Sequence, residues 1–199
     1  MDQNELRLVV AAGLKSAGQA DRAELAASPV STMLGPAREL PGGAVVILFE
    51  AFPHPNASFY AGLVAGRVYY LTGRPKAFGD MMRASGLHVA QERTAAEIAR
   101  GYVETTRTMD TFTTVLDSVD DIGWDTRPGD GPTPALVASL RESVRPPTVT
   151  AVGPGRYEVS LFVLHGTAAE RRVLSVSTDG AVTERTEQVV SDLPVPFSF

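Results

Sequence analysis

The sequence predicts an α+β fold in which antiparallel β-meanders, about seven strands in all, pack against four to five helices. The last quarter of the chain, from Arg156 to Val190, contains three strand-like runs in succession. Asp179-Gly180, between the last two runs, is a strong hairpin signal and predicts a type I′ or related tight turn. Further short apolar runs lie between Val45 and Thr72, and helical patterns separate the two groups. Strands and helices are thus segregated along the chain, which is typical of α+β proteins.

The chain is expected to begin with two helices. Apolar residues recur at helical spacing over residues 3–17, which predicts an amphipathic helix. A shorter helix is expected from Asp21 to Ala27, because Pro29 prevents its continuation. Residues 28–43 hold three prolines and three glycines, and this composition predicts a loop.

A first meander is expected after this loop. Val45–Phe52 is a continuous apolar run of strand length. Ser58–Val64 and Arg67–Thr72 are two further strand-like runs, and Ala65-Gly66 between them suits a tight hairpin. Together these runs predict three consecutive antiparallel strands.

Two helices should follow the first meander. Pro75 is well placed as the first residue of one helix, and Gly86 as its left-handed stop. Phe78, Met81 and Met82 are expected to form the buried face of this helix. Thr94 and Glu97 have the spacing of a capping box, which predicts the start of the next helix. That helix carries an apolar stripe, formed by Ala95, Ala99, Tyr102, Val103, Thr106 and Met109.

The second half of the chain predicts one more helix and the second meander. Residues 111–116 fit either a strand or a continuation of the preceding helix, and residues 117–133 predict a loop. Thr133-Pro134 suits the start of a helix. The strands expected after it are Thr148–Val152, Tyr157–Leu164, Arg171–Thr178 and Ala181–Val190. The whole chain, 1–199, is expected to form a single domain, with a possible sub-division near 123–134.

A helix followed by four antiparallel strands, over about residues 133–190, resembles the cystatin-like and nuclear-transport-factor-2-like cone folds. The resemblance implies a curved sheet that wraps a helix and leaves a pocket. It is a resemblance of architecture without a shared motif, and architecture alone implies little about function.

Composition excludes several classes of function. The net charge of -5 and the pI near 5.2 argue against a nucleic-acid partner, which needs a basic face. The absence of cysteine excludes disulfides, thiolate nucleophiles and iron–sulfur clusters. The acidic start of the chain is unlike a signal peptide, and no apolar run approaches the length of a membrane span. We therefore expect a cytoplasmic protein that binds no cofactor, and heavy use of arginine over lysine suggests a bacterial source.

Glu50 and His54 are the candidate catalytic residues. Glu50 lies inside an apolar run, and a buried carboxylate needs a partner or a raised pKa, as carboxylates at active sites have. His54 lies between two prolines, whose restricted φ holds the loop in one conformation. The alternatives are a solvated carboxylate at the end of a strand and an ordinary turn. The three histidines lack the spacing of a helical metal-binding pair, so no metal site is expected.

Four aromatic residues are candidate ligand-binding residues, although aromatic side chains on strands belong more often to a core. They are Tyr60, Tyr69, Tyr70 and Trp124. In the tail, Leu193, Val195, Phe197 and Phe199 alternate with polar or proline residues. This apolar row predicts that the tail docks on its own sheet or on a partner.

Two functions remain open, because no catalytic motif is present. The first is a non-enzymatic accessory or interaction protein with an antiparallel sheet surface, whose partner could be a second copy in a homodimer. The alternative is a cofactor-free small-molecule-binding protein or enzyme of the isomerase, cyclase or hydrolase kind, with a pocket in the curved sheet. Convergence of Glu50 with a histidine or tyrosine in a closed cavity would favour the small-molecule-binding protein or enzyme.

Overall fold

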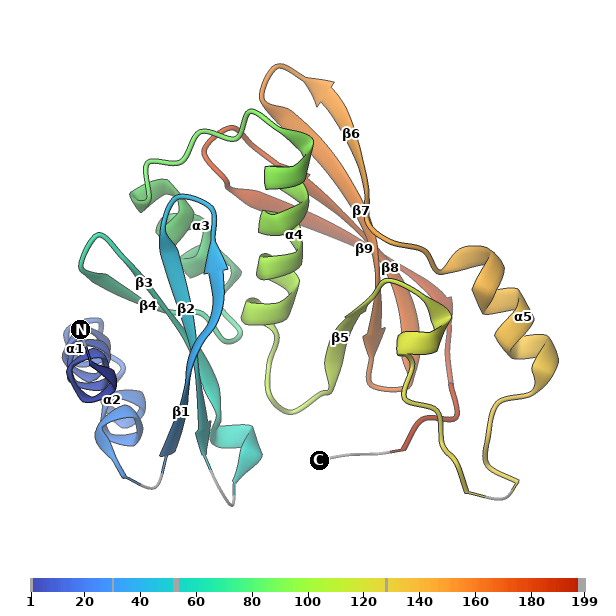
Figure 1. The fold of residues 1–199 in the computed structure, drawn as a ribbon, viewed down its shortest axis with the longest axis horizontal. Coiled ribbons are helices and arrows are strands. Elements are labelled where there is room, and N and C mark those ends of the chain that lie inside the picture. The colour runs from blue at the N-terminus through green and yellow to red at the C-terminus, as the bar shows by residue number, and fades with distance from the viewer. Residues whose placement is uncertain (1, 30, 52–53, 128, 197–199) are drawn as a thin grey trace.

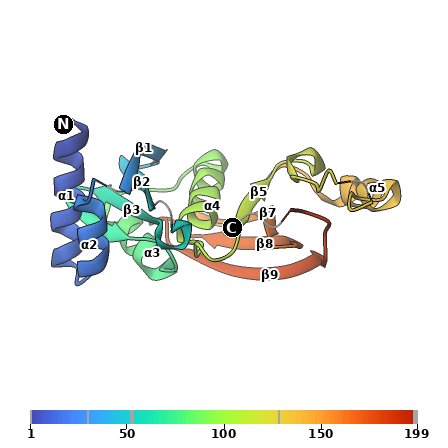
Figure 2. The ribbon, with the colours of Figure 1, turned by 90° about the horizontal axis from the view of Figure 1, so that it is seen from below.

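The computed structural model describes residues 2–29, 31–51, 54–127 and 129–196, apart from the side chains of residues 36 and 37. It confirms the α+β class, with two antiparallel sheets and, within these ranges, five α-helices. The elements form stacked layers (Figures 1 and 2). Helices α1 and α2 cover one face of the first sheet, α3 and α4 lie between the two sheets, and α5 lies at the far end.

The two N-terminal helices form as predicted. Helix α1 (Gln3–Ser16) begins at a capping box, in which Asp2 accepts from the Glu5 amide and Glu5 accepts from the Asp2 amide. Helix α2 spans Ala20–Ala27. Val10 and Leu14 of α1 are fully buried, and they pack against the first sheet together with Phe49 and Phe59.

The first sheet, called sheet A, contains one strand more than the meander predicted. Its order is β1 (Ser31–Leu40), β2 (Ala44–Ala51), β3 (Phe59–Val64) and β4 (Arg67–Tyr70). Strand β1 lies where a loop was expected, so that prediction is wrong. β1 is an edge strand, and its register shifts on both sides of Pro36, next to Gly35 with φ of +77°. Edges and bulges are the positions where a sheet tolerates proline and glycine.

The hairpin between β3 and β4 confirms the predicted turn. Ala65 and Gly66 have φ of 48° and 73°, the left-handed pair that a type I′ turn requires. Val64 pairs with Arg67 directly across this turn.

Helix α3 (Pro75–Ala84) follows its prediction more closely than α4 (Glu92–Thr106) does. The face of α3 expected to be buried is fully buried in the core. The capping box expected at Thr94 is wrong, because α4 begins earlier, after Gln91. The Glu97 carboxylate instead accepts a hydrogen bond from Arg93 along the helix surface, with 3.0 Å between Nε and Oε1.

The second sheet, called sheet B, is built around β7. Strand β7 (Arg156–His165) pairs with β8 (Ala168–Val176) on one side, and with β5 (Thr113–Leu116) and β6 (Thr148–Gly153) on the other. Strand β9 (Val182–Val190) pairs with β8 and forms the outer edge. Residues 113–116 are thus a strand, the stretch before α5 (Pro134–Ser143) contains a short 3-10 turn at Val119–Asp121, and the described chain has nine strands rather than about seven.

The β8–β9 hairpin confirms the broader form of the predicted turn. Of the Asp179-Gly180 pair, only Gly180 has a positive φ, +76°, so the turn is not type I′. The Gly180 amide donates to the Ser177 carbonyl, and the Ser177 amide donates to the Ala181 carbonyl. This pattern is a type I turn closed by a left-handed glycine.

The core between the sheets contains side chains from both sheets. It contains Val46 and Val64 from sheet A, Val159 and Leu174 from sheet B, and Ile98 of α4. A second core lies between α1, α2 and the outer face of sheet A. A third packs α5 and the C-terminal tail against the outer face of sheet B.

Replacing Gly13 by alanine should destabilise the protein, although alanine favours a helix by about 1 kcal/mol. A β-carbon at Gly13 would lie 2.4 Å from Cγ2 and 2.5 Å from Cβ of Val68, so α1 would have to move away from β4. Such overpacking costs about 1–3 kcal/mol. Urea unfolding should therefore show a lower free energy of unfolding for Gly13→Ala.

Two further variants test this contact with Val68. Gly123→Ala should have little effect by the same measurement, because nothing lies within 4 Å of the added carbon. In a Val68→Ala background, Gly13→Ala should cost clearly less, because the two methyl groups are gone and only the contact with the β-carbon remains. An equal loss in both backgrounds would contradict the proposed contact.

Candidate functional site

The two candidate catalytic residues are exposed and do not converge with a tyrosine in a closed cavity. Glu50 lies near the end of β2 with its side chain in solvent, so the expectation that it is buried is wrong. Its apolar neighbours reflect a strand covered on both faces, since Val46 faces the core between the sheets and Phe49 faces α1 and α2. His54 is also exposed. Whether either residue has a catalytic role stays a prediction.

The four candidate aromatic residues belong to three different cores. Tyr60 and Tyr69 pack into the core between the sheets, and Tyr70 packs on the opposite face of sheet A. Trp124 packs beside the third core, near α5. The Tyr60 hydroxyl accepts a hydrogen bond from Arg107, with 3.2 Å between the oxygen and Nη2. These residues therefore contribute to packing, and they do not surround one common ligand site.

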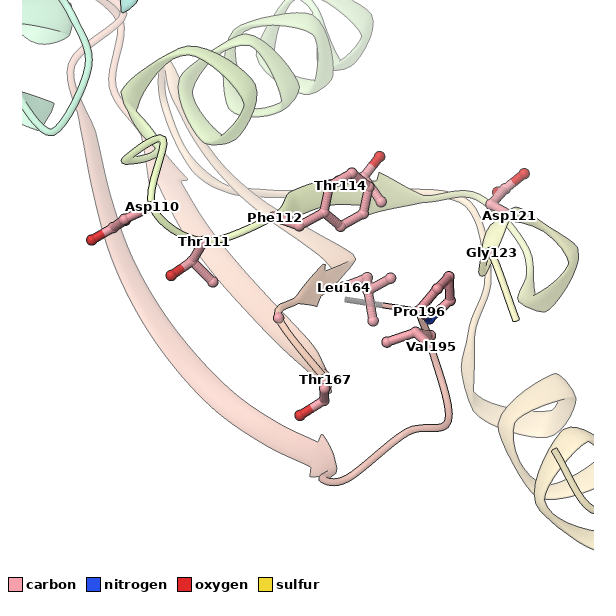
Figure 3. A pocket seen from close by; sticks show the side chains of 11 residues that line it. Asp110, Thr111, Phe112, Thr114, Asp121, Gly123, Leu164, Thr167, Val195 and Pro196 are labelled. Carbon is pink, nitrogen blue, oxygen red and sulfur yellow. The ribbon is translucent and has the colours of Figure 1, made fainter. Parts of the chain in front are cut away.

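A cavity of about 590 Å³ opens elsewhere, at the end of sheet B (Figure 3). The connection from α4 to β5, the end of β7 and the C-terminal tail surround it. Phe112, Leu164 and Val195 supply its apolar surface. The other lining residues are Asp110, Thr111, Thr114, Asp121, Gly123, Gly166, Thr167 and Pro196.

Strand pairing positions the side of this cavity formed by β5 and β7. Thr114 lies opposite Leu164 in the antiparallel β5–β7 pair, so both side chains project from the same face of the sheet. Before the strand begins, the Gly166 amide donates to the Phe112 carbonyl at 2.8 Å. This bond fixes the backbone of Phe112, whose side chain stays 53% exposed at the cavity.

The C-terminal tail forms the opposite side. The Leu193 amide donates to the Thr167 carbonyl at 2.8 Å, and the Asp125 amide donates to the Pro194 carbonyl at 2.9 Å. Leu193 is buried in the third core. The tail thus docks on its own chain over these residues, whereas Phe197 and Phe199 lie outside the described residues.

Two carboxylates give the cavity a negative rim. The pKa of Asp110 is lowered, chiefly because its carboxylate accepts a hydrogen bond from the Thr108 hydroxyl. The pKa of Asp121 is lowered because its carboxylate accepts from the amides of Ser118 and Asp117, at 2.8 and 2.7 Å. Both groups are therefore ionised at neutral pH, and they favour a ligand with a positive charge.

The two carboxyl groups of the described lining have pKa values that do not suit proton transfer near neutral pH. These groups belong to Asp110 and Asp121, and a general acid or base works best with a pKa near the operating pH. The lowered pKa values move both carboxyl groups away from that range. Among the described lining residues are three threonines, and these residues include no histidine or lysine to activate the hydroxyl groups.

A smaller cavity of about 190 Å³ adjoins the first and shares Asp110, Thr111 and Phe112 with it. Glu50 lines this smaller cavity together with Arg107. The Arg107 side chain donates to the Thr113 carbonyl at 2.6 Å and lies over the Tyr60 ring. It connects sheet A to sheet B at this end of the molecule.

Within the described ranges, no group of three His, Cys, Asp or Glu side chains could hold a metal ion. The absence of a metal and of a nucleic-acid partner stay predictions. The described helices include none that is both long and apolar enough to cross a membrane.

Comparison with known proteins identifies no relative, since no family model, curated protein or solved structure matches the chain. The choice of this cavity as the candidate site therefore rests on its geometry alone. Sequence patterns missed most of its lining, including Phe112 and Leu164. The apolar row in the tail was the one signal that pointed to this region.

A cluster of ion pairs lies on the other face of sheet B, beneath α4. Arg172 contacts Glu170 at 2.9 Å and Glu184 at 3.1 Å, and all three side chains are at least four-fifths buried. Tyr102 of α4 adjoins them, and its pKa is raised to about 12 by burial and then by the charge and hydrogen bond of Glu184. The cluster joins β9 to β8 and to the central helix.

Tyr102→Phe should reduce the sensitivity of the fold to alkaline pH. Because the pKa of Tyr102 is raised from 10.0 to about 12, the folded protein holds this proton more tightly than the unfolded chain does. Its contribution to stability is complete below pH 10 and is lost as the pH rises towards 12. Urea midpoints measured from pH 8 to 12 should fall less steeply for the variant, and parallel curves would contradict the shifted pKa.

Proposed function

We propose that this protein is a non-enzymatic binding protein that takes an apolar side chain of a partner protein into the cavity beside Phe112. The observation that carries the proposal is the cavity itself, with an apolar surface, ionised carboxylates at its rim and no acid–base pair among its lining residues. The partner segment suited to it carries a large apolar residue next to a lysine or arginine.

The exposure of Phe112 supports a docking role. A half-exposed phenylalanine at a concave, largely apolar surface is typical of an interaction site, because aromatic side chains supply much of the binding energy at protein interfaces. The backbone that carries this side chain is held by the bond from Gly166 and by the β5–β7 pairing that begins at Thr113. Little backbone ordering would be needed on binding, which favours affinity.

The positions of Glu50 and His54 support binding over catalysis. Both are exposed, and a catalytic acid or base usually works in a site that excludes water. The aromatic residues that were candidates for a substrate pocket are taken up by the cores.

A small-molecule ligand is the second candidate. The cavity volume of about 590 Å³ lies within the range of small-molecule sites, about 300–1,000 Å³. The same lining would take an amphiphile with an apolar body and a positively charged group. This alternative keeps the site and changes only the occupant.

A peptide array tests the proposed function. The labelled protein is applied to peptides that combine Phe, Leu or Trp with neighbouring Lys or Arg, and calorimetry measures the affinity of the best peptide. Phe112→Ser should weaken binding about tenfold or more, or about 1.4 kcal/mol. Asp110→Asn should weaken it less, and mainly at low salt, because its charge lies at the rim.

Val152→Ser is the matched control, since Val152 is a similarly exposed apolar side chain, 58% against 53% for Phe112, and it lies on β6 away from the cavity. This variant should bind like the wild type. An array without a selective peptide, together with a melting temperature raised by cationic amphiphiles and not in Phe112→Ser, would favour the small-molecule candidate. Equal binding by Phe112→Ser and the wild type would contradict both.

A further inference from the structure

The outer edge of β9 is unpaired in the described chain. Strand β9 spans Val182–Val190, pairs with β8 alone and runs along the margin of the molecule (Figure 2). Its residues from Thr183 to Gln188 are all exposed, although the Glu184 side chain is itself four-fifths buried beside Arg172. A long free edge presents unused backbone donors and acceptors to another strand.

The hairpin determines which residues present these groups. The Ser177 amide donates to the Ala181 carbonyl, so this pair is hydrogen-bonded. In an antiparallel ladder, hydrogen-bonded pairs recur at every second residue. Arg185 and Glu187, opposite Val173 and Arg171, therefore bond to β8. The amides and carbonyls of Glu184, Thr186 and Gln188 point outwards.

The charges on β9 favour one antiparallel pairing with a second copy of the strand. When Thr186 lies opposite Thr186 of the second copy, Glu184 lies opposite Gln188, and the outward-facing backbone groups meet. In this register Arg185 lies opposite Glu187 of the second copy, and the two-fold axis repeats the pair. Opposite charges at such cross-strand positions stabilise a sheet.

Neighbouring registers are disfavoured by like charges. Because outward-facing residues must lie opposite one another, the second strand can slide only by two residues at a time. One shift places Arg185 opposite Arg185 of the second copy, and the other places Glu187 opposite Glu187. Like charges directly opposite one another are destabilising. Of these three registers, the charges thus favour the one centred on Thr186.

The same side chains already take part in ion pairs across each sheet. Arg185 lies 3.6 Å from Glu158, and Glu187 lies 3.8 Å from Arg171. Both contacts are long, and the Arg185 and Glu187 side chains stay 72% and 71% exposed, so each can accept another partner. The second copy would extend these pairs into an alternating row from Glu158 to Arg171 of the second copy.

We infer that β9 is a homodimer interface, in which two copies join their β-sheets edge to edge with Thr186 on the two-fold axis. The inference is independent of the proposed cavity function, because the cavity lining includes no residue of β9. A single strand pair buries less area than most stable interfaces, so the dimer should dissociate on dilution.

Charge exchange between chains tests the register. Sedimentation of the full chain over roughly a hundredfold range of concentration should show a monomer–dimer equilibrium. Arg185→Glu and Glu187→Arg, each alone, should be monomeric over this range, because each variant places like charges opposite one another. An equimolar mixture of the two should form dimers again. In the mixed dimer the introduced glutamate faces the introduced arginine, and the unchanged Arg185 of one chain faces the unchanged Glu187 of the other. The double variant Arg185→Glu/Glu187→Arg should also dimerise.

A backbone substitution tests the strand pairing itself. Thr186→Pro removes an outward-facing amide that β8 does not use, so it should abolish the dimer and leave the monomer folded. Thr186→Val, the control, keeps the amide and should stay dimeric. Circular dichroism confirms that each variant is folded. A wild-type monomer at all concentrations, a dimer that survives Thr186→Pro, or a mixture of single variants that stays monomeric would each overturn the inference.

Discussion

The packing of α4 between the two sheets is the interaction on which the rest of the structure depends. The helix contacts β1 on one side and β5, β6, β7 and β8 on the other. Both sides must therefore be apolar, and small residues allow the sheets to approach. Ala95 and Ala99 are fully buried, and a β-carbon on Gly101 would lie 2.5 Å from the Leu40 side chain of β1. The loss of this helix would expose the inner faces of both sheets to water.

The end of α4 also explains where the cavities form. The helix ends at Thr106, and the chain then crosses towards β5 without regular structure. Asp110, Thr111 and Phe112 in this connection line both cavities. Glu50 lies at the same end of sheet A, beyond the apolar layer that covers Val46. Both cavities thus form where the chain leaves α4 and passes along the ends of the sheets.

Local signals predicted those parts of the fold that are determined by neighbouring residues. The Ala65-Gly66 turn, the buried face of α3 and the strands of the second meander follow from backbone conformation and periodicity. Strand β1 was missed because Gly35 and Pro36 indicate a loop unless a bulge on an edge strand accommodates them, and that depends on the pairing with β2. Glu50 was expected to be buried because the sequence shows apolar neighbours but not where the covering layer ends. The cavity was missed because its walls come from three segments far apart in the sequence.

The order in which the layers occur along the chain has a consequence for synthesis on the ribosome. Sheet A, α3 and α4 are complete in the first 106 residues, but the strands that cover the second side of α4 come from residues 113–176. Until those residues emerge, the nascent chain carries a helix with one apolar side uncovered. The tail that closes the outer face of sheet B follows these strands in the chain and emerges after them. Packing of both sheets must therefore wait until these later segments have emerged, and until then the uncovered side of α4 is a defined apolar surface that a chaperone could bind.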